Sequence, residues 1–171
     1  PLAGVRVVDF CWALAGPLAT RVLADLGAEV LKIESEHRLD SIRHVGPQPT
    51  ETVSLDTNGV FQDGSAGKRA VTVNLDTEEG RGIVRQLIET ADVVVANYTP
   101  YRLDRWGFDA TTLQRIRPGL IVANMAVMGL TGPNSGWRSY GNGIVAACGI
   151  AAHTGFEHRP PECLGTMHTD F

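Results

Sequence analysis

The chain has 171 residues, of which 43% are hydrophobic and 20% charged, so it can bury the core of an ordinary globular domain. The formal net charge is −4 and the two signs are interspersed, which excludes the electrostatic footprint of a nucleic-acid-binding protein. No stretch approaches the roughly 18 apolar residues that cross a bilayer, and the N-terminus lacks a signal-peptide layout, so we expect a cytoplasmic protein with no membrane partner.

The first part of the chain predicts a strand–helix–strand unit. Residues 4–10 alternate and then run apolar, as in a strand, and the turn at 15–17 leads into a helix whose first turn accommodates Pro17. Residues 29–34 form a second strand, at a separation that suits a parallel crossover. Helical spacing predicts an inward face made of Ala19, Val22, Leu23 and Leu26.

The middle of the chain contains an irregular stretch and a second strand–helix pair. Residues 35–67 are rich in Gly, Pro, Asp, Ser and Thr without sustained periodicity, so we expect a long loop there. A strand is predicted at 69–75, followed by a helix that Thr77 caps. The inward face of that helix is expected to hold Ile83, Val84, Leu87 and Ile88.

The last third continues the alternation. The apolar run 91–96 is typical of a strand covered on both faces, and 120–125 forms another strand after a helix-like segment at 111–116. Residues 143–152 are small and helical in pattern. Together these elements predict an α/β fold with a Rossmann-like, doubly wound, mostly parallel sheet.

In such a sheet, ligands bind beyond the carboxyl ends of the strands. That rule selects the segments 11–17, 34–43, 97–105 and 125–133. The turn at 15–17 presents backbone N–H groups at a helix start, but neither a dinucleotide-binding nor a P-loop motif is present. Six basic residues in loops or at strand starts either converge on an anionic cofactor or are scattered surface charges: Arg38, Arg43, Lys68, Arg69, Arg102 and Arg105.

Cysteine and histidine patterns give no sign of a metal or of a known nucleophile motif. Cys11, Cys148 and Cys163 are widely separated and form no CxxC pair, so we expect buried, reduced thiols. The five histidines include no HExxH motif. We therefore expect no metal site, and spacing alone assembles no catalytic triad.

Several stretches, taken in order, resemble the signatures of one enzyme family. They are LAGVRVVDF at 2–10, LAGP at 14–17, LADLGAEVLKIE at 23–34, GKR at 67–69, ADVVV at 91–95 with Asn97, and LTGP at 130–133. In this order and spacing they resemble the family III CoA-transferases, the group of formyl-CoA and carnitine CoA-transferases. The resemblance runs from end to end of the chain.

The resemblance implies an enzyme that moves CoA from an acyl-CoA donor to a free carboxylic acid, without a metal. It also implies an interlocked homodimer of considerably longer chains. Residues 1–171 would then be the N-terminal, CoA-binding, Rossmann-like domain. The chain starts without a methionine and stops just after Asp170, so we expect it to be a fragment of a longer chain.

By resemblance, Asp170 aligns with the family's catalytic aspartate, the nucleophile that becomes an aspartyl-CoA thioester. From the sequence alone, an aspartate beside a phenylalanine is more typical of a helix cap. The CoA-binding positions that the resemblance implies are Ala13, Leu14, Arg38, Val73, Asn74, Leu75, Asp76, Asn97, Tyr98, Thr99 and Arg105.

Departures from the family pattern bear on the substrate and on the reaction. Leu14 stands where formyl-CoA transferases carry a glutamine, which disfavours formate or oxalate. Ser35 stands where the family has an arginine, so Arg38 is a candidate replacement. The related α-methylacyl-CoA racemases use a His–Asp pair whose Gly-His-Asp motif is missing here at residues 139–141, where Tyr140 favours the transferase. A non-catalytic CoA-binding subunit is a further alternative.

Overall fold

A five-stranded parallel sheet forms the centre of the computed structural model, which describes residues 1–46, 48, 54–162, 165 and 168–170. Its order is β3-β2-β1-β4-β5, with every pair parallel. The strand order reverses direction at the β1–β4 pair, so the predicted doubly wound α/β topology is confirmed. The strands are β1 (Arg6–Asp9), β2 (Glu29–Glu34), β3 (Arg69–Thr72), β4 (Val93–Ala96) and β5 (Ile121–Asn124).

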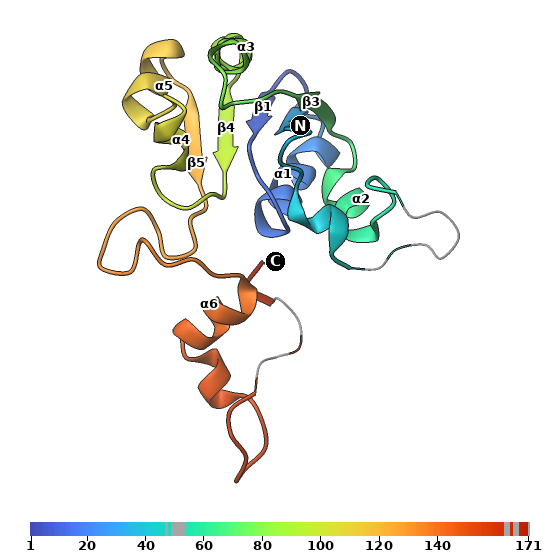
Figure 1. Ribbon diagram of the computed structural model, residues 1–171, viewed down its shortest axis with the longest axis vertical. Coiled ribbons are helices and arrows are strands. Elements are labelled where there is room, and N and C mark those ends of the chain that lie inside the picture. Colours follow the sequence, from blue (N-terminus) through green and yellow to red (C-terminus); the bar gives the residue numbers. More distant parts are fainter. Residues whose placement is uncertain (47, 49–53, 163–164, 166–167, 171) are drawn as a thin grey trace.

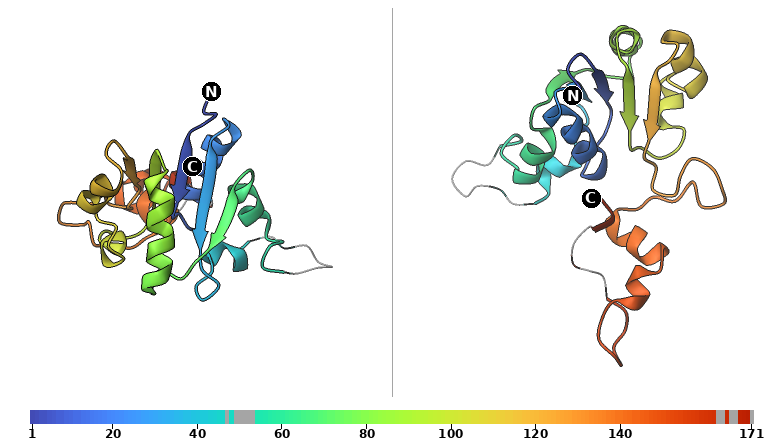
Figure 2. Two further views of the ribbon diagram at one scale, coloured as in Figure 1. Left: turned by 90° about the horizontal axis from the view of Figure 1, so that it is seen from above. Right: turned by 180° about the vertical axis from the view of Figure 1, so that it is seen from behind.

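Helices cover both faces of this sheet (Figures 1 and 2). On one face, α1 (Ala15–Asp25) packs against a cluster that includes Val7. On the other face, α3 (Glu78–Glu89) and α5 (Ala110–Ile116) pack on the larger cluster around Val8. Successive strand residues point to opposite faces, so coverage of both faces accounts for the continuous apolar runs of the central strands.

The inward face of α1 differs from the one that periodicity predicts. Val22 is 55% exposed and Ala19 is also exposed, whereas Gly16 and Thr20 are buried. Thr20 Oγ1 donates a hydrogen bond to Asp9 Oδ2, at the end of β1 (2.7 Å). Leu23, from the predicted inward face, does pack against the cluster around Val7. Because a buried carboxylate needs such donors, Thr20 also turns toward the sheet, while Ala19, Val22 and Leu26 are exposed.

The composition of the stretch from Ser35 to Gly67 predicts a long loop. Its described part instead contains two short helices. The 3-10 helix η1 (Ser41–His44) follows Asp40, and α2 (Gly59–Ser65) follows Asn58. Both preceding side chains accept hydrogen bonds from main-chain N–H groups of the helix that they cap. Short capped helices lack the repeated apolar spacing on which the sequence prediction depended.

Other helical predictions hold in part. Thr77 caps α3 by accepting from Gly80 N, as predicted, and Val84 and Ile88 are fully buried while Ile83 is 43% exposed. The helix expected at 143–152 is divided into α6 (Gly141–Ala147) and the 3-10 helix η2 (Ile150–His153). The short helix α4 (Arg102–Arg105) follows β4 and was not anticipated.

The described residues between Trp137 and Asp170, here called the arm, project from the carboxyl end of the sheet (Figure 1). Its last described element, η3 (His168–Asp170), packs against α6 and so brings Asp170 back toward the sheet. No helix in the described ranges has the length and apolar character to cross a membrane.

Candidate active site

A cavity of about 840 Å³ lies at the carboxyl ends of the strands, between the sheet and the arm. The segments that follow β1 and β4 both line it, so it occupies the switch point of the strand order, where ligands bind in such folds. Every position that the family resemblance implies for the site borders this cavity: Ala13, Leu14, Arg38, Val73, Asn74, Leu75, Asp76, Asn97, Tyr98, Thr99, Arg105 and Asp170.

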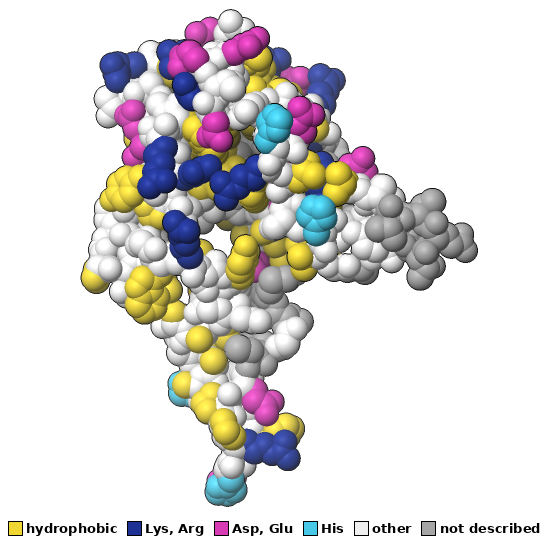
Figure 3. Space-filling model, viewed as in Figure 1, with side chains coloured by type: hydrophobic (Ala, Val, Ile, Leu, Met, Phe, Trp, Pro, Cys, Tyr) yellow, Lys and Arg dark blue, Asp and Glu magenta, His cyan; other side chains and the backbone are white. Residues whose placement is uncertain are grey.

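Four arginines line the cavity, namely Arg38, Arg102, Arg105 and Arg138. Figure 3 shows Lys and Arg side chains gathered above the hollow between the sheet and the arm. Within the described ranges, none of the four has a carboxylate within 4.0 Å. Unpaired guanidinium groups at one opening favour a phosphate-bearing ligand. Arg138 was missed because a lone charge in a loop carries no sequence signal.

The three other basic residues named from the sequence do not reach this cavity. Arg43 is paired with Glu34 beneath the cavity wall, and its guanidinium lies 3.6 Å from the ring centre of Phe61. Lys68 is buried against Asp9, and burial lowers the pKa of its ammonium group. Arg69, at the amino end of β3, pairs with Glu29 on the neighbouring strand.

Aromatic rings and guanidinium groups alternate along one wall of the cavity. Trp12 and Tyr98 meet edge to face with ring centres 5.8 Å apart, and Tyr98 and Trp106 do the same at 5.7 Å. Arg38 lies 5.3 Å from the centre of the Trp12 ring, and Arg102 lies 4.5 Å from that of Trp106. Burial raises the pKa of Tyr98, so this wall carries a neutral phenol. Such a wall suits a ligand with a flat base and phosphates.

Asp170 reaches the cavity from the arm. Gly141 N donates a hydrogen bond to Asp170 Oδ2 (3.2 Å), and Thr169 Oγ1 donates one to Gly141 O (2.9 Å). The carboxylate therefore does cap a helix, α6, although 29 positions separate it from Gly141. Burial raises the pKa of Asp170, whereas the Gly141 hydrogen bond lowers it. Among the described residues, only Oδ2 of this half-buried carboxylate accepts a hydrogen bond, and a carboxylate with a free oxygen can act as a nucleophile.

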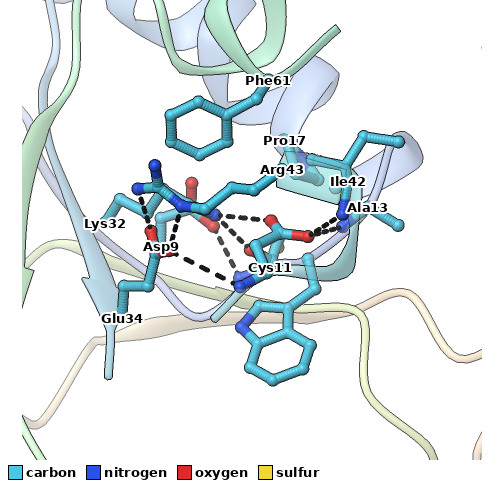
Figure 4. A network of polar contacts seen from close by, with 12 residues as sticks. Asp9, Cys11, Ala13, Pro17, Lys32, Glu34, Ile42, Arg43 and Phe61 are labelled. Atoms are coloured by element: carbon cyan, nitrogen blue, oxygen red, sulfur yellow. Dashed lines mark hydrogen bonds and ion pairs between the residues drawn. The ribbon is translucent and has the colours of Figure 1, made fainter. Parts of the chain in front are cut away.

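A network of buried charges lies beneath the loop that follows β1 (Figure 4). Asp9 accepts hydrogen bonds from Thr20 Oγ1 and from Lys68 Nζ, while Lys32 Nζ contacts Asp40 Oδ2 at 3.1 Å. Each of these charges is paired and hydrogen-bonded, as burial requires. The network is internal, so it supports the cavity wall and does not bind ligand directly.

Of the three cysteines predicted to be buried, one is buried, one is exposed and one lies outside the described residues. Cys11 is fully buried, and burial together with nearby Asp9 raises the pKa of its thiol, which makes it a poor nucleophile. Cys148 is exposed, contrary to the expectation of a buried thiol, while Cys163 lies outside the described residues.

Over the part of the chain that the structure describes, no three His, Cys, Asp or Glu side chains gather as metal ligands.

Comparison with known proteins gives consistent matches. The model of CoA-transferase family III matches residues 2–171. The chain is 33% identical to the succinate–glutarate CoA-transferase of Agrobacterium fabrum, over 99% of this chain and 43% of that protein. It is 35% identical to the succinyl-CoA–D-citramalate CoA-transferase of Chloroflexus aurantiacus, over 96% of this chain and 40% of that protein.

The fold of this chain is also similar to that of a solved structure. The crystal structure of a CAIB/BAIF family protein from Brucella suis superposes with a TM-score of 0.89 and 36% identity. That alignment covers 99% of this chain and 45% of the other. The chain thus spans less than half the length of the relatives it matches. From the family match over residues 2–171, we conclude that the chain belongs to CoA-transferase family III.

Proposed function

We propose that the protein carrying this chain transfers CoA from an acyl-CoA donor to a free carboxylic acid, with Asp170 as the nucleophile. The observation that carries the proposal is the position of Asp170 on the same cavity as four unpaired arginines and an aromatic wall. The arginines suit the phosphates of CoA, and the aromatic rings suit its adenine. The carboxylate would then meet the thioester end of the same molecule.

The proposed chemistry balances without an added cofactor. An oxygen of Asp170 attacks the thioester carbonyl, the C–S bond breaks, and a mixed anhydride and the CoA thiolate result. The thiolate then attacks the aspartyl carbonyl, the donor acid leaves as its carboxylate, and an aspartyl-CoA thioester remains. The acceptor carboxylate reverses these steps, so the product is a new acyl-CoA and Asp170 is restored as a carboxylate.

The racemase alternative requires a histidine partner for the aspartate. Tyr140 occupies the position of that histidine and lines the cavity together with Asp170. A tyrosine hydroxyl lacks the basic nitrogen with which a histidine removes an α-proton, whereas it can donate a hydrogen bond to a developing oxyanion. Tyr140 therefore favours acyl transfer over racemisation.

For the acceptor, we propose an acid larger than formate. Leu14 lines the cavity where formyl-CoA transferases carry a glutamine, so an amide that could bind a very small acid is replaced by an apolar side chain. Two of the relatives described above are named for glutarate and for D-citramalate, which are larger than formate. Acceptor specificity is measured by offering a series of acids with one acyl-CoA donor.

We also propose a homodimer, as the family resemblance implies. In the described chain, Trp137, Tyr140 and Phe156 of the arm are all more than half exposed. Exposed apolar side chains of this size are typical of a surface that another chain covers. Light scattering on the intact protein should give the mass of two chains, and the mass of one chain would contradict the proposal.

The nucleophile is tested by trapping. The intact protein is incubated with acyl-CoA and hydroxylamine, which converts an aspartyl thioester or anhydride to a hydroxamate, and the modified residue is located by mass spectrometry. We expect modification at Asp170, none at Asp76 of the same cavity, and none in Asp170→Asn. Deuterium wash-in at the α-carbon without CoA exchange would instead indicate a racemase, and CoA binding with neither reaction would indicate a non-catalytic subunit.

A further inference from the structure

The Cys11–Ala13 segment joins β1 to α1 and lines the cavity with Trp12 and Ala13. It lies outside regular secondary structure, and Ala13 has φ +61°, in the left-handed region that residues with a Cβ seldom adopt. Such a backbone conformation persists only where surrounding groups hold it. The groups that hold this segment are therefore part of how the cavity is built.

Asn97, which follows β4, binds the main chain of Trp12 on both sides. Its Oδ1 accepts from Trp12 N (2.9 Å), and its Nδ2 donates to Trp12 O (2.7 Å). Ala13 N, the next donor along, is bonded to Asp40 Oδ1 (2.9 Å). Two side chains from distant parts of the sequence thus hold the peptide groups on both sides of Trp12, immediately before the left-handed Ala13.

The same segment is held at its start. Cys11 N donates to Asp9 Oδ1 (2.8 Å), and Lys32 Nζ donates both to Cys11 O (2.8 Å) and to Asp40 Oδ2 (3.1 Å). Asp9, Cys11 and Lys32 are labelled in Figure 4. Five main-chain polar groups in a row, from Cys11 N to Ala13 N, therefore have side-chain partners. Asp9, Lys32 and Asp40 are all at most 2% exposed, so water competes little for the buried bonds to Cys11 N and Cys11 O.

We propose that Asn97 and Asp40 are positioning residues for the transfer reaction, which hold Trp12 and Ala13 in the conformation that shapes the cavity. This inference rests on the proposed function. It gives Asn97 a role different from the CoA contact that the family resemblance implies, because Trp12 sets the orientation of its amide. Displacing a cavity wall by about 1 Å can lower the rate of a catalysed step on the order of 10²-fold.

Asn97→Ala tests this role, with Asn58→Ala as the matched control. Asn58 is a buried amide that, like the partly buried Asn97, holds main-chain groups, at Val45 O, Val60 N and Phe61 N, but it does not line the cavity. We expect both variants to lose similar thermal stability. Only Asn97→Ala should lose kcat, on the order of 10²-fold, with the KM for acyl-CoA nearly unchanged.

Two results would overturn the assignment. A raised KM for acyl-CoA with kcat unchanged would make Asn97 a ligand contact instead. A similar loss of kcat in Asn58→Ala would show that general destabilisation is the cause.

A substitution at Ala13, the residue with positive φ, tests whether Asn97 acts by holding this residue in its conformation. Glycine adopts positive φ without the cost that a Cβ adds, so Ala13→Gly should restore part of the kcat lost in Asn97→Ala. Additive effects of the two substitutions would contradict the idea that Asn97 acts by holding Ala13 in this conformation.

Hydrogen exchange separates failure of this inference from failure of the proposed function. The amide of Trp12 should exchange faster in Asn97→Ala than in the wild type, and Asn58→Ala should leave its rate unchanged. If the intact wild-type protein transfers no CoA, the proposed function fails and so does the catalytic part of this inference. Unchanged exchange of Trp12 in Asn97→Ala would overturn the structural part by itself.

Discussion

The sheet and the arm bound the same cavity, but they hold their polar groups in different ways. On the sheet side, buried charges have several partners each, as Asp9 does with the main chain of Cys11 and the side chains of Thr20 and Lys68. On the arm side, Asp170 accepts one hydrogen bond from Gly141, and the surrounding surface is largely exposed. Among the described residues, the buried charges on the sheet side thus have more hydrogen-bond partners than Asp170, the proposed nucleophile, has on the arm side.

The largest expected effect is on stability at the sheet side. Lys32→Met removes the ammonium and leaves the buried Asp40 carboxylate uncompensated, which we expect to cost about 3–5 kcal/mol of unfolding free energy. Arg69→Met is the matched control, because it breaks an ion pair with Glu29 whose arginine is 76% exposed and should cost about 1 kcal/mol or less. Equal shifts in urea midpoint would contradict this view of the buried network.

Gly16 tests how closely α1 approaches the Cys11–Ala13 segment. A Cβ built at Gly16 lies 2.5 Å from both Cβ and Sγ of Cys11, so Gly16→Ala should destabilise the protein by about 1–3 kcal/mol. Gly82→Ala provides a control of opposite sign, because that position in α3 has open space and alanine should stabilise the helix by about 0.5–1 kcal/mol. Thermal unfolding of the two variants measures the contrast.

On the arm, the expected stability effect is smaller. Thr169→Val removes the hydrogen bond to Gly141 O and should cost about 0.5–1.5 kcal/mol. Thr154→Val, which removes an equivalent bond to Ile150 O in the same arm, should cost about as much. Only the first should lower the rate of CoA transfer, since Thr169 adjoins Asp170. A similar rate loss in both variants would contradict a specific role for the Gly141 contact.

The smallest expected effect is the dependence of stability and activity on pH through Asp170. Burial raises the pKa of Asp170, so its contribution to stability is present below the unfolded pKa and is lost as pH rises through the folded pKa. In the proposed mechanism Asp170 must be deprotonated to attack, so activity should rise with pH through that same raised pKa. The acid limb of the pH–rate profile therefore reports the state of Asp170.

A pair of substitutions at Gly141 sharpens this measurement. Gly141 is the first residue of α6, a position that accepts proline, and its N–H lowers the pKa of Asp170. Gly141→Pro removes that N–H, so the acid limb should move to higher pH. Gly141→Ala retains the N–H and should leave the limb in place, which controls for the added carbon. A limb that moves equally in both variants would exclude the hydrogen bond as the cause.

Sequence periodicity predicted the strands of the sheet well, because periodicity depends on residues that are neighbours along the chain. The range predicted for β2 matches the observed strand Glu29–Glu34, and the Thr77 cap of α3 is a contact between residues three apart. Periodicity was only partly right for α1, where Thr20 turns inward to the buried Asp9. A partner on another element outweighed the apolar spacing of that helix.

The resemblance to a family also supplied what spacing could not. Asp170 carries no local signal of catalysis, and it entered the candidate site only through that resemblance. The structure adds its hydrogen bond from Gly141 and its place on the cavity, which support the proposed role. Arg138 had neither a family motif nor a local pattern, so only the folded chain brought it into view.

By itself, the sequence determined the alternation of strands and helices, the parallel sheet and the family, because these depend on short-range patterns and on ordered motifs. Only the tertiary structure decided which arginines face the cavity and which are buried in ion pairs. It also decided that Asn97 holds Trp12, 85 positions away, because β1 and β4 are neighbours in the sheet. Hydrogen bonds act over about 3 Å, so partners this far apart in the chain can be recognised only once the fold has brought them together.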